Sequence, residues 1–157
     1  MKHREARSLL EQISKDFGSI TELSEKDLRI EAAEVNGEEL IFLNAKPSII
    51  KIGIRLLPTL VFNRVLESLP RVVVDMNAIP RVCNGADIMA PGVRRVEGEF
   101  PVSSVIVVTD DRYGKFLAVG EALKGSDDLK TTRHGKVVLN RHYVGDKIWN
   151  AISKITA

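Results

Sequence analysis

The residues with the clearest chemical potential lie in one short stretch of the sequence. Gly85 and Gly92 enclose a mostly apolar segment, and Arg94 and Arg95 follow it at once. Glycine lets a sugar-phosphate chain approach the backbone, whose N–H groups can hold phosphate oxygens. Guanidinium groups add bidentate contacts to phosphates. These residue types are suited to contacts with anionic groups; the alternative is an ordinary turn with two solvated arginines.

The sequence offers no set of residues suited to catalysis. His3, His134 and His142 have no Cys or acidic companions at metal-ligand spacing. Neither a Gly-x-Ser-x-Gly motif nor a phosphate-binding loop ending in Gly-Lys-Ser/Thr is present. The pairs Asp110-Asp111 and Asp127-Asp128 are adjacent in sequence, which favours turn formation over shared acid–base work. We therefore expect no enzyme activity, no cofactor and no metal.

Composition and charge indicate an ordinary globular protein. The 157 residues are 44% apolar and 28% charged, with a net charge of +2. Residues 1–70 hold ten Lys and Arg against eleven Asp and Glu, whereas residues 71–157 hold thirteen against ten. The basic excess of the second half suits a nucleic-acid partner. The single Cys83, the lack of an apolar leader and the lack of a membrane-length apolar run predict a cytoplasmic protein without a membrane partner.

The hydrophobic pattern divides the chain into two units with a boundary near residue 70. Residues 1–70 predict a small α/β domain with a helix over 2–17, strands over 28–35, 39–44 and 48–54, and a second helix from Pro58 to Pro70. Asn36-Gly37 is a strong hairpin signal between the first two strands. Residues 71–157 predict short strands with a helix over 77–84 and a last helix that begins at Asp146. The expected fold class is α+β, with a mostly antiparallel pseudo-barrel in the second domain.

Within the second domain, the stretch from Gly85 to Arg95 has a regular interpretation. Gly85 ends the helix, residues 87–90 form a short buried strand, and Pro91-Gly92 make a sharp turn that aims the two arginines outward. Ile148, Ile152 and Ile155 give the last helix an apolar face, and Trp149 beside that face is expected to be a core anchor.

The order of these segments resembles a PUA domain, the RNA-binding module named for pseudouridine synthase and archaeosine transglycosylase. The segments that carry the resemblance are Val72-Val73-Val74-Asp75, Ala78 to Val82, Gly85 to Val93, Val105 to Val108, Phe116 to Gly120 and Gly135 to Tyr143. The resemblance implies an RNA-binding face formed by the first PUA helix, the loop and strand after it, and the last strand. On this sequence the implied contact residues are Arg81, Gly85, Ala86, Asp87, Met89, Pro91, Gly92, Arg94, Arg95, Lys136, Arg141, His142 and Tyr143.

An α/β unit of about 70 residues directly before a PUA domain is similar to the malignant T-cell amplified sequence family and its archaeal relatives. That resemblance implies an accessory factor of translation that engages the acceptor end of tRNA, the small ribosomal subunit, or both, and a translation factor is a possible protein partner. Two alternatives stay open from the residues alone. The chain is then either a non-catalytic tRNA-binding subunit of an RNA-modification enzyme or a protein-interaction adapter without an RNA role. We expect a monomer.

Overall fold

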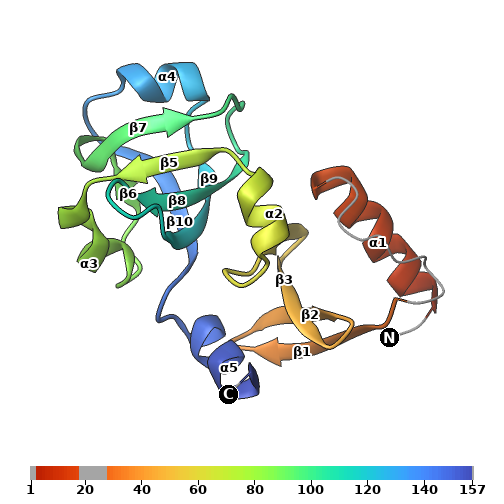
Figure 1. The fold of residues 1–157 in the computed structure, drawn as a ribbon. Coiled ribbons are helices and arrows are strands. Elements are labelled where there is room, and N and C mark those ends of the chain that lie inside the picture. The colour runs from red at the N-terminus through yellow and green to blue at the C-terminus, as the bar shows by residue number, and fades with distance from the viewer. Residues whose placement is uncertain (1–2, 18–27, 157) are drawn as a thin grey trace.

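The computed structural model describes residues 3–17 and 28–156, and it contains two β-sheets joined by short connections (Figure 1). The first sheet is antiparallel, with the strand order β1-β2-β3-β4. Its strands are β1 (Ile30–Val35), β2 (Glu38–Leu43), β3 (Lys46–Ile52) and β4 (Arg55–Pro58), and α1 (His3–Phe17) and α2 (Asn63–Ser68) accompany them. Asn36 and Gly37 have φ of 54° and 82°, so the predicted hairpin is confirmed with both turn residues in the left-handed region.

The prediction that Pro58 starts a helix is wrong. Pro58 closes β4, where it pairs with Ile49, and α2 begins only at Asn63. Proline is tolerated at the end of an edge strand as well as in the first turn of a helix, because its fixed φ is compatible with both. The predicted third strand also begins earlier than expected, because Pro47 lies inside β3, opposite Phe42 on β2.

The second sheet has six strands in the order β6-β10-β9-β8-β5-β7 and curls into a half-barrel. The strands are β5 (Arg71–Val74), β6 (Ile88–Met89), β7 (Val93–Glu97), β8 (Val105–Asp110), β9 (Phe116–Ala122) and β10 (Lys136–Tyr143). The pair β5–β8 is parallel and the other pairs are antiparallel. The expected α+β class with a mostly antiparallel second unit is therefore confirmed.

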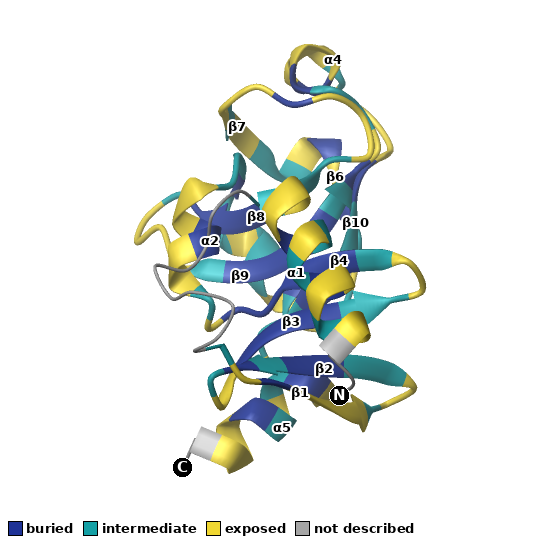
Figure 2. Cartoon of the chain, turned by 90° about the vertical axis from the view of Figure 1, so that its right-hand side faces the viewer, coloured by how far each residue is buried: buried dark blue, intermediate teal, exposed yellow. Residues whose placement is uncertain are grey.

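Short helices close the ends of this half-barrel. They are η1 (Met76–Ala78), α3 (Ile79–Val82), η2 (Ala90–Gly92) and α4 (Ser126–Thr131), whereas the last helix, α5 (Lys147–Thr156), packs against the first sheet. The core beneath them is rich in valine, and β8 and β9 carry the densest buried segments (Figure 2). The hairpin loop expected after β8 is present, since Asp110 accepts hydrogen bonds from the backbone N–H groups of Arg112, Tyr113 and Lys115.

Helix α5 joins the two sheets. Ile148 and Ile152 are buried against Leu40 and Ile50 of the first sheet, although α5 follows the last strand of the second (Figure 1). Asp146 caps the helix as predicted, because its Oδ1 accepts the N–H of Trp149 at 2.7 Å. Trp149 packs in a cluster that contains Leu57 and Leu60 of the N-terminal unit. The two sheets therefore share apolar contacts rather than being held only by a linker.

None of the helices in the described part of the chain is both long and apolar enough to span a membrane.

Candidate nucleic-acid interface

Gly85 adopts a backbone conformation that any other residue could adopt only with strain. Gly85 has φ of 92°, and a Cβ at this position would lie 3.0 Å from the Tyr143 hydroxyl oxygen and 3.1 Å from its ring carbon Cζ. The ring of Tyr143 thus lies directly against the backbone that ends α3. This packing of the Tyr143 ring accounts for the glycine at position 85, and it leaves the next residue, Ala86, exposed beside the ring.

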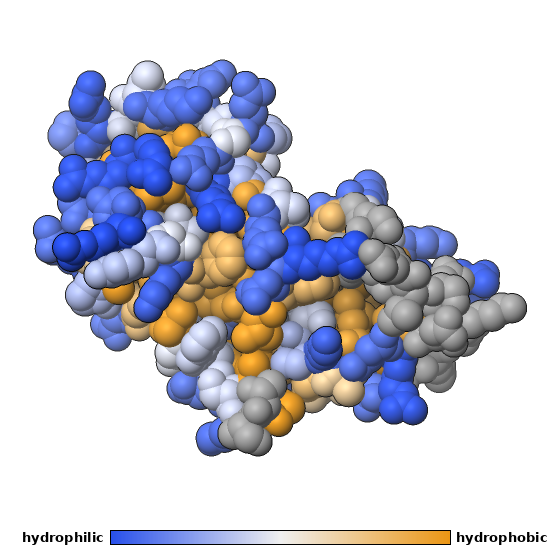
Figure 3. Space-filling view, in the orientation of Figure 1, coloured by the Kyte–Doolittle hydropathy of each residue, from blue (hydrophilic) through white to orange (hydrophobic). Residues whose placement is uncertain are grey.

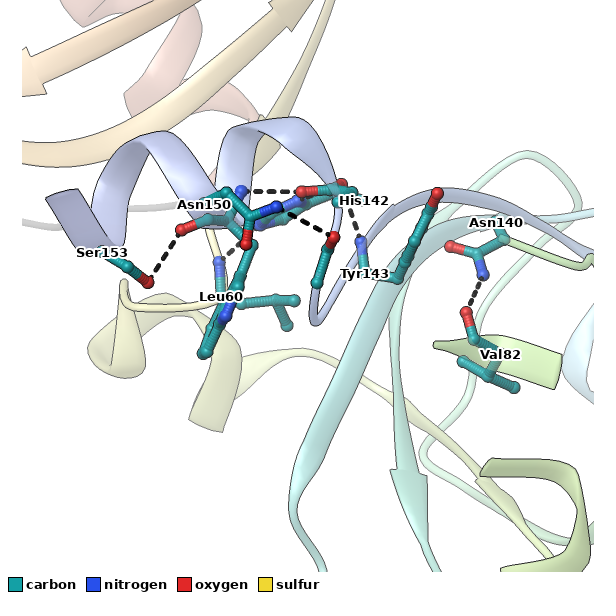
Figure 4. Close-up of polar contacts among 10 residues, drawn as sticks. Leu60, Val82, Asn140, His142, Tyr143, Asn150 and Ser153 are labelled. Atoms are coloured by element: carbon teal, nitrogen blue, oxygen red, sulfur yellow. Dashed lines mark hydrogen bonds and ion pairs between the residues drawn. The ribbon is translucent and has the colours of Figure 1, made fainter. Parts of the chain in front are cut away.

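Asp87 holds this loop onto β10. Its Oδ1 accepts the backbone N–H of Asn140 at 2.9 Å, and its Oδ2 lies 3.2 Å from the Lys136 ammonium. Asn140 completes the connection by donating from Nδ2 to the carbonyl oxygen of Val82 (Figure 4) and to that of Ala86, each at 3.0 Å. The acid expected among the contact residues therefore has a positioning role, and it fixes Lys136 at the edge of the surface.

The side chains around this loop form what we call the β10 face, defined by Arg81, Gly85, Ala86, Asp87, Met89, Lys136 and Tyr143. Arg81 and Ala86 are exposed, and Met89 is 44% exposed opposite Lys136 in the β6–β10 ladder. Arg81 forms no ion pair within the described residues, and the Lys136 side chain stays 59% exposed beside Asp87. The face thus offers two accessible cations, an apolar side chain and an aromatic ring.

Arg94 and Arg95 lie on a different strand from these residues. The turn lies at Pro91-Gly92 as predicted, within η2, and both arginines follow it on β7, at the opposite edge of the sheet from β6. Arg94 forms ion pairs with Asp75 and Asp111, and Arg95 Nε lies 2.9 Å from Glu97 Oε2. The backbone N–H of Asn77 and the nearby Arg94 charge hold the pKa of Asp75 below its ordinary value, so this pair stays ionised.

Pro91 and Gly92 connect the two regions within η2. Pro91 is exposed, whereas the position of a Gly92 Cβ would be 3.6 Å from Ala78, an ordinary contact distance. Gly92 also lacks the positive φ of Gly85. A special role for Gly92 in close approach therefore finds no support in its geometry.

A bulge in β10 separates the last predicted residues from one another. Asn140 pairs with Gly120 and His142 with Val119, so Arg141 is the extra residue on the bulged strand. Asn140 and Tyr143 lie on the side of α3, whereas Arg141 bonds to Glu121 at 2.7 Å and His142 contacts the N-terminal unit. The contact residues implied for this strand are therefore divided between its two sides.

His142 corrects the sequence expectation most clearly, because its side chain is completely buried. The Leu60 N–H donates to its Nε2 at 3.1 Å, so the proton is on Nδ1, which donates to Asp146 Oδ2 at 2.8 Å (Figure 4). Burial opposes ionisation of Asp146, but the contacts with His142 and the N–H groups of Trp149 and Tyr143 outweigh it and lower the Asp146 pKa. His142 is a structural link between the units and not a surface contact.

Sequence reasoning missed two further cations, Lys130 and Arg133. Both are exposed beside β7, and α4, the helix that presents Lys130, was not expected from the sequence. Arg133 lies beyond Thr132, the extended C-cap residue of α4, so no helical spacing relates it to Lys130 and no local signal marked the two as a pair. Asn140 was missed as well, since its role depends on the bulge. Within the described residues no group of three or more His, Cys, Asp or Glu is placed to hold a metal ion.

Comparison with known proteins agrees with this geometry. A PUA-domain model matches residues 70–144, and a model described as a domain of unknown function, DUF1947, matches residues 1–64. An uncharacterized protein of Methanocaldococcus jannaschii is 33% identical over 96% of this chain and 93% of its own length. The chain belongs to the family of PUA-domain proteins that carry this N-terminal region. The resemblance seen in the sequence is thereby confirmed.

Relatives with informative names include two eukaryotic proteins. Translation machinery-associated protein 20 of Saccharomyces cerevisiae is 29% identical over 82% of this chain and 71% of its own length. Malignant T-cell-amplified sequence 1-B of Xenopus laevis is 34% identical over 77% of this chain and 65% of its own length. Among solved structures, a PUA-domain protein from Aeropyrum pernix in a tartrate complex has a TM-score of 0.82 at 27% identity, covering 100% of this chain and 91% of that one.

Proposed function

We propose that this PUA-domain protein is a non-catalytic RNA-binding factor of translation, which uses the β10 face to hold the acceptor end of tRNA or a comparable structured RNA. The observation that carries the proposal is the arrangement around Gly85. There, the exposed backbone turn at Ala86, an aromatic ring and two accessible cations occupy one surface of a domain of the RNA-binding PUA class. The names of the yeast and frog relatives support the link to translation.

The chemistry of the face suits a terminal, partly unpaired RNA. Arg81 and Lys136 can each contact a phosphate, and Tyr143 presents an aromatic ring beside the Gly85 backbone. Only 5% of the residues are aromatic, so the surface cannot stack a long single strand. A small number of phosphate contacts predicts modest affinity. Attachment to the small ribosomal subunit through the N-terminal unit would add avidity without new contacts to tRNA.

Binding of purified protein to intact tRNA, and to the same tRNA lacking its 3′ end, tests the proposal at two salt concentrations. Arg81→Gln with Lys136→Gln removes two charges from the face without placing a carboxylate beside Asp87. Loss of two phosphate contacts is expected to weaken binding to intact tRNA about tenfold, because each contact contributes to counterion release. Arg64→Gln with Lys154→Gln is the matched control, since both residues are exposed and lie outside the β10 face.

Two results would contradict the proposal. Equal binding of the truncated and intact tRNA by the native protein would show that the face does not recognise the acceptor end. Equal weakening by the face and control variants would show that the interaction is non-specific attraction between charges. Sedimentation of the native protein with ribosomes or small subunits from cell extract examines the ribosomal part of the proposal separately.

A further inference from the structure

A groove of about 540 Å³ lies between β7 and α4, beside the β10 face. Four of its ten lining residues are cationic, and no Asp or Glu of the described chain is among them. The lining consists of Ala90, Pro91, Val93, Arg94, Arg95, Val96, Leu129, Lys130, Thr132 and Arg133. In Figure 3 apolar surface is visible between the hydrophilic side chains over α4 and those over β7. The groove therefore has an apolar floor between two basic walls.

The two walls hold their cations differently. On the β7 wall, Arg94 is fixed by Asp75 and Asp111, and Arg95 is bonded through Nε to Glu97, which leaves its terminal nitrogens available. On the α4 wall, Lys130 and Arg133 are exposed and have no ion-pair or hydrogen-bond partner for their side chains in the described part of the chain. Exposed cations without a partner beside an apolar floor are available to an anionic ligand that also has apolar surface.

The size and lining of the groove define the occupant. A volume of 540 Å³ falls within the range of roughly 300–1,000 Å³ that accommodates small-molecule ligands, which is room for one or two nucleotides. A duplex carries its phosphates on the outside of a rigid cylinder and could touch only the rim. An unpaired strand can lay ribose and base edges on Pro91 and Val96 while its phosphates reach the walls.

The groove continues directly from the β10 face. The Ala90 N–H donates to the Gly135 carbonyl at 2.8 Å, so the loop that carries Arg133 is joined to the end of β6. Lys136 follows Gly135 on one side, and Ala90 and Pro91 line the groove on the other. A strand leaving Lys136 meets Arg133 next, without crossing an acidic residue of the groove lining.

We propose that the β7–α4 groove holds the sugar-phosphate backbone of unpaired RNA nucleotides that run on from the β10 face, with Lys130, Arg133 and Arg95 as phosphate contacts. This inference rests on the proposed function, because it assigns a second segment of the same RNA. It also gives a role to Arg95, which is not part of the β10 face.

The experiment uses two labelled RNAs, a hairpin with a four-nucleotide unpaired 3′ tail and the same hairpin with a blunt end. Lys130→Gln with Arg133→Gln removes the free cations of the α4 wall, and Arg64→Gln with Lys154→Gln is again the control. The groove variant is expected to bind the tailed hairpin about tenfold more weakly and the blunt hairpin within about twofold of the native protein. Arg95→Gln, on the opposite wall, should produce a smaller loss in the same direction. For each variant, the slope of log affinity for the tailed RNA against log salt concentration should decrease in magnitude by about one per lost phosphate contact.

The outcomes separate the two proposals. If the native protein binds the tailed hairpin and the groove variant binds it equally well, the groove inference is overturned while the β10 face stands. Equal weakening on tailed and blunt RNA would also overturn it, because the cations would then act through general attraction. If the native protein binds neither RNA, the proposed function fails and the groove inference fails with it. Circular dichroism and thermal melting of each variant confirm that the exposed substitutions leave the fold intact.

Discussion

Strand β10 contributes to two regions of opposite character. On one side Lys136, Asn140 and Tyr143 support an open face with accessible charge, and on the other Arg141 and His142 are occupied by contacts with neighbouring chain segments. The bulge at Arg141 changes the side on which the following residues lie. The comparison teaches that polar residues adjacent in sequence can serve recognition and domain assembly separately, and that burial and pairing decide which role each residue has.

We call the side of β10 that carries Arg141 and His142 the assembly side. Its polar groups have more hydrogen-bond and ion-pair partners than the cations of the open face. His142 uses both ring nitrogens, Asp146 accepts three hydrogen bonds, and Glu121 binds Arg141 and Arg55 of β4 at 2.7 and 3.2 Å. On the open face Arg81 has no ion pair in the described chain, and the side chain of Lys136 is paired with Asp87 but remains mostly exposed to solvent. Satisfied buried networks stabilise a fold, whereas exposed unpaired cations are available for a ligand.

The largest expected effect comes from removing the buried histidine. His142→Leu leaves the Leu60 N–H and the Asp146 carboxylate without their partner, and buried groups that lose a partner cost about 2–4 kcal/mol. We expect the free energy of unfolding in urea to fall by that amount, while RNA affinity of the folded variant stays within about twofold. His134→Leu is the control, because His134 is exposed. A stable His142→Leu protein that no longer binds RNA would restore His142 to the RNA face.

A smaller effect, with a defined pH dependence, is expected for Asp146→Asn. This variant keeps the size of the side chain but loses the charge that faces His142 and caps α5, at a cost of about 1–2 kcal/mol near pH 7. The folded-state pKa of Asp146 lies below the value of about 3.9 for an unfolded aspartate. Its charge therefore stabilises the fold at pH values above about 5, and the contribution is lost as the pH falls through the folded pKa.

Urea denaturation of native and Asp146→Asn protein at pH 7 and again near pH 3 measures this dependence. The difference between the two proteins should shrink at the lower pH. Asp16→Asn, at an exposed position of α1, supplies the control for general charge effects. A difference that is unchanged between the two pH values would show that hydrogen bonding alone, without the charge, accounts for the role of Asp146.

The sequence predicted those parts of the fold that depend on local chemistry. The Asn36-Gly37 turn, the Asp146 cap and the Asp110 loop follow from residue types whose backbone preferences are strong. Pro58 was misplaced because proline suits both a strand end and a helix start. Helix α4 was missed because it is only six residues long and carries a short apolar signal, with Leu129 as its buried aliphatic residue.

The candidate site was harder to predict than the fold. The family resemblance implied Lys136, Arg141 and His142 alike, because it gives a stretch of the last strand and not the side of the strand on which each residue lies. A β-bulge depends on how a strand meets its neighbour, which here is β9, and no local residue type announces it. The cations of α4 were missed for a related reason, since only the folded sheet edge brings Lys130 beside β7.

The smallest effect is expected for Arg141→Gln, which is compared with Lys136→Gln on the same strand. Arg141 is bonded to Glu121 on the assembly side, and exposed ion pairs of this kind contribute about 0–1 kcal/mol to stability. Arg141→Gln should therefore change the free energy of unfolding by less than about 1 kcal/mol and tRNA affinity by less than about twofold. Lys136→Gln removes the same charge from a position five residues away on the same strand, and it should weaken tRNA binding severalfold and lower the salt slope by about one. Measuring both variants against one tRNA at several salt concentrations compares the two sides of β10 directly. Equal losses would mean that the RNA reaches around the edge of the strand and that the bulge does not divide recognition from assembly.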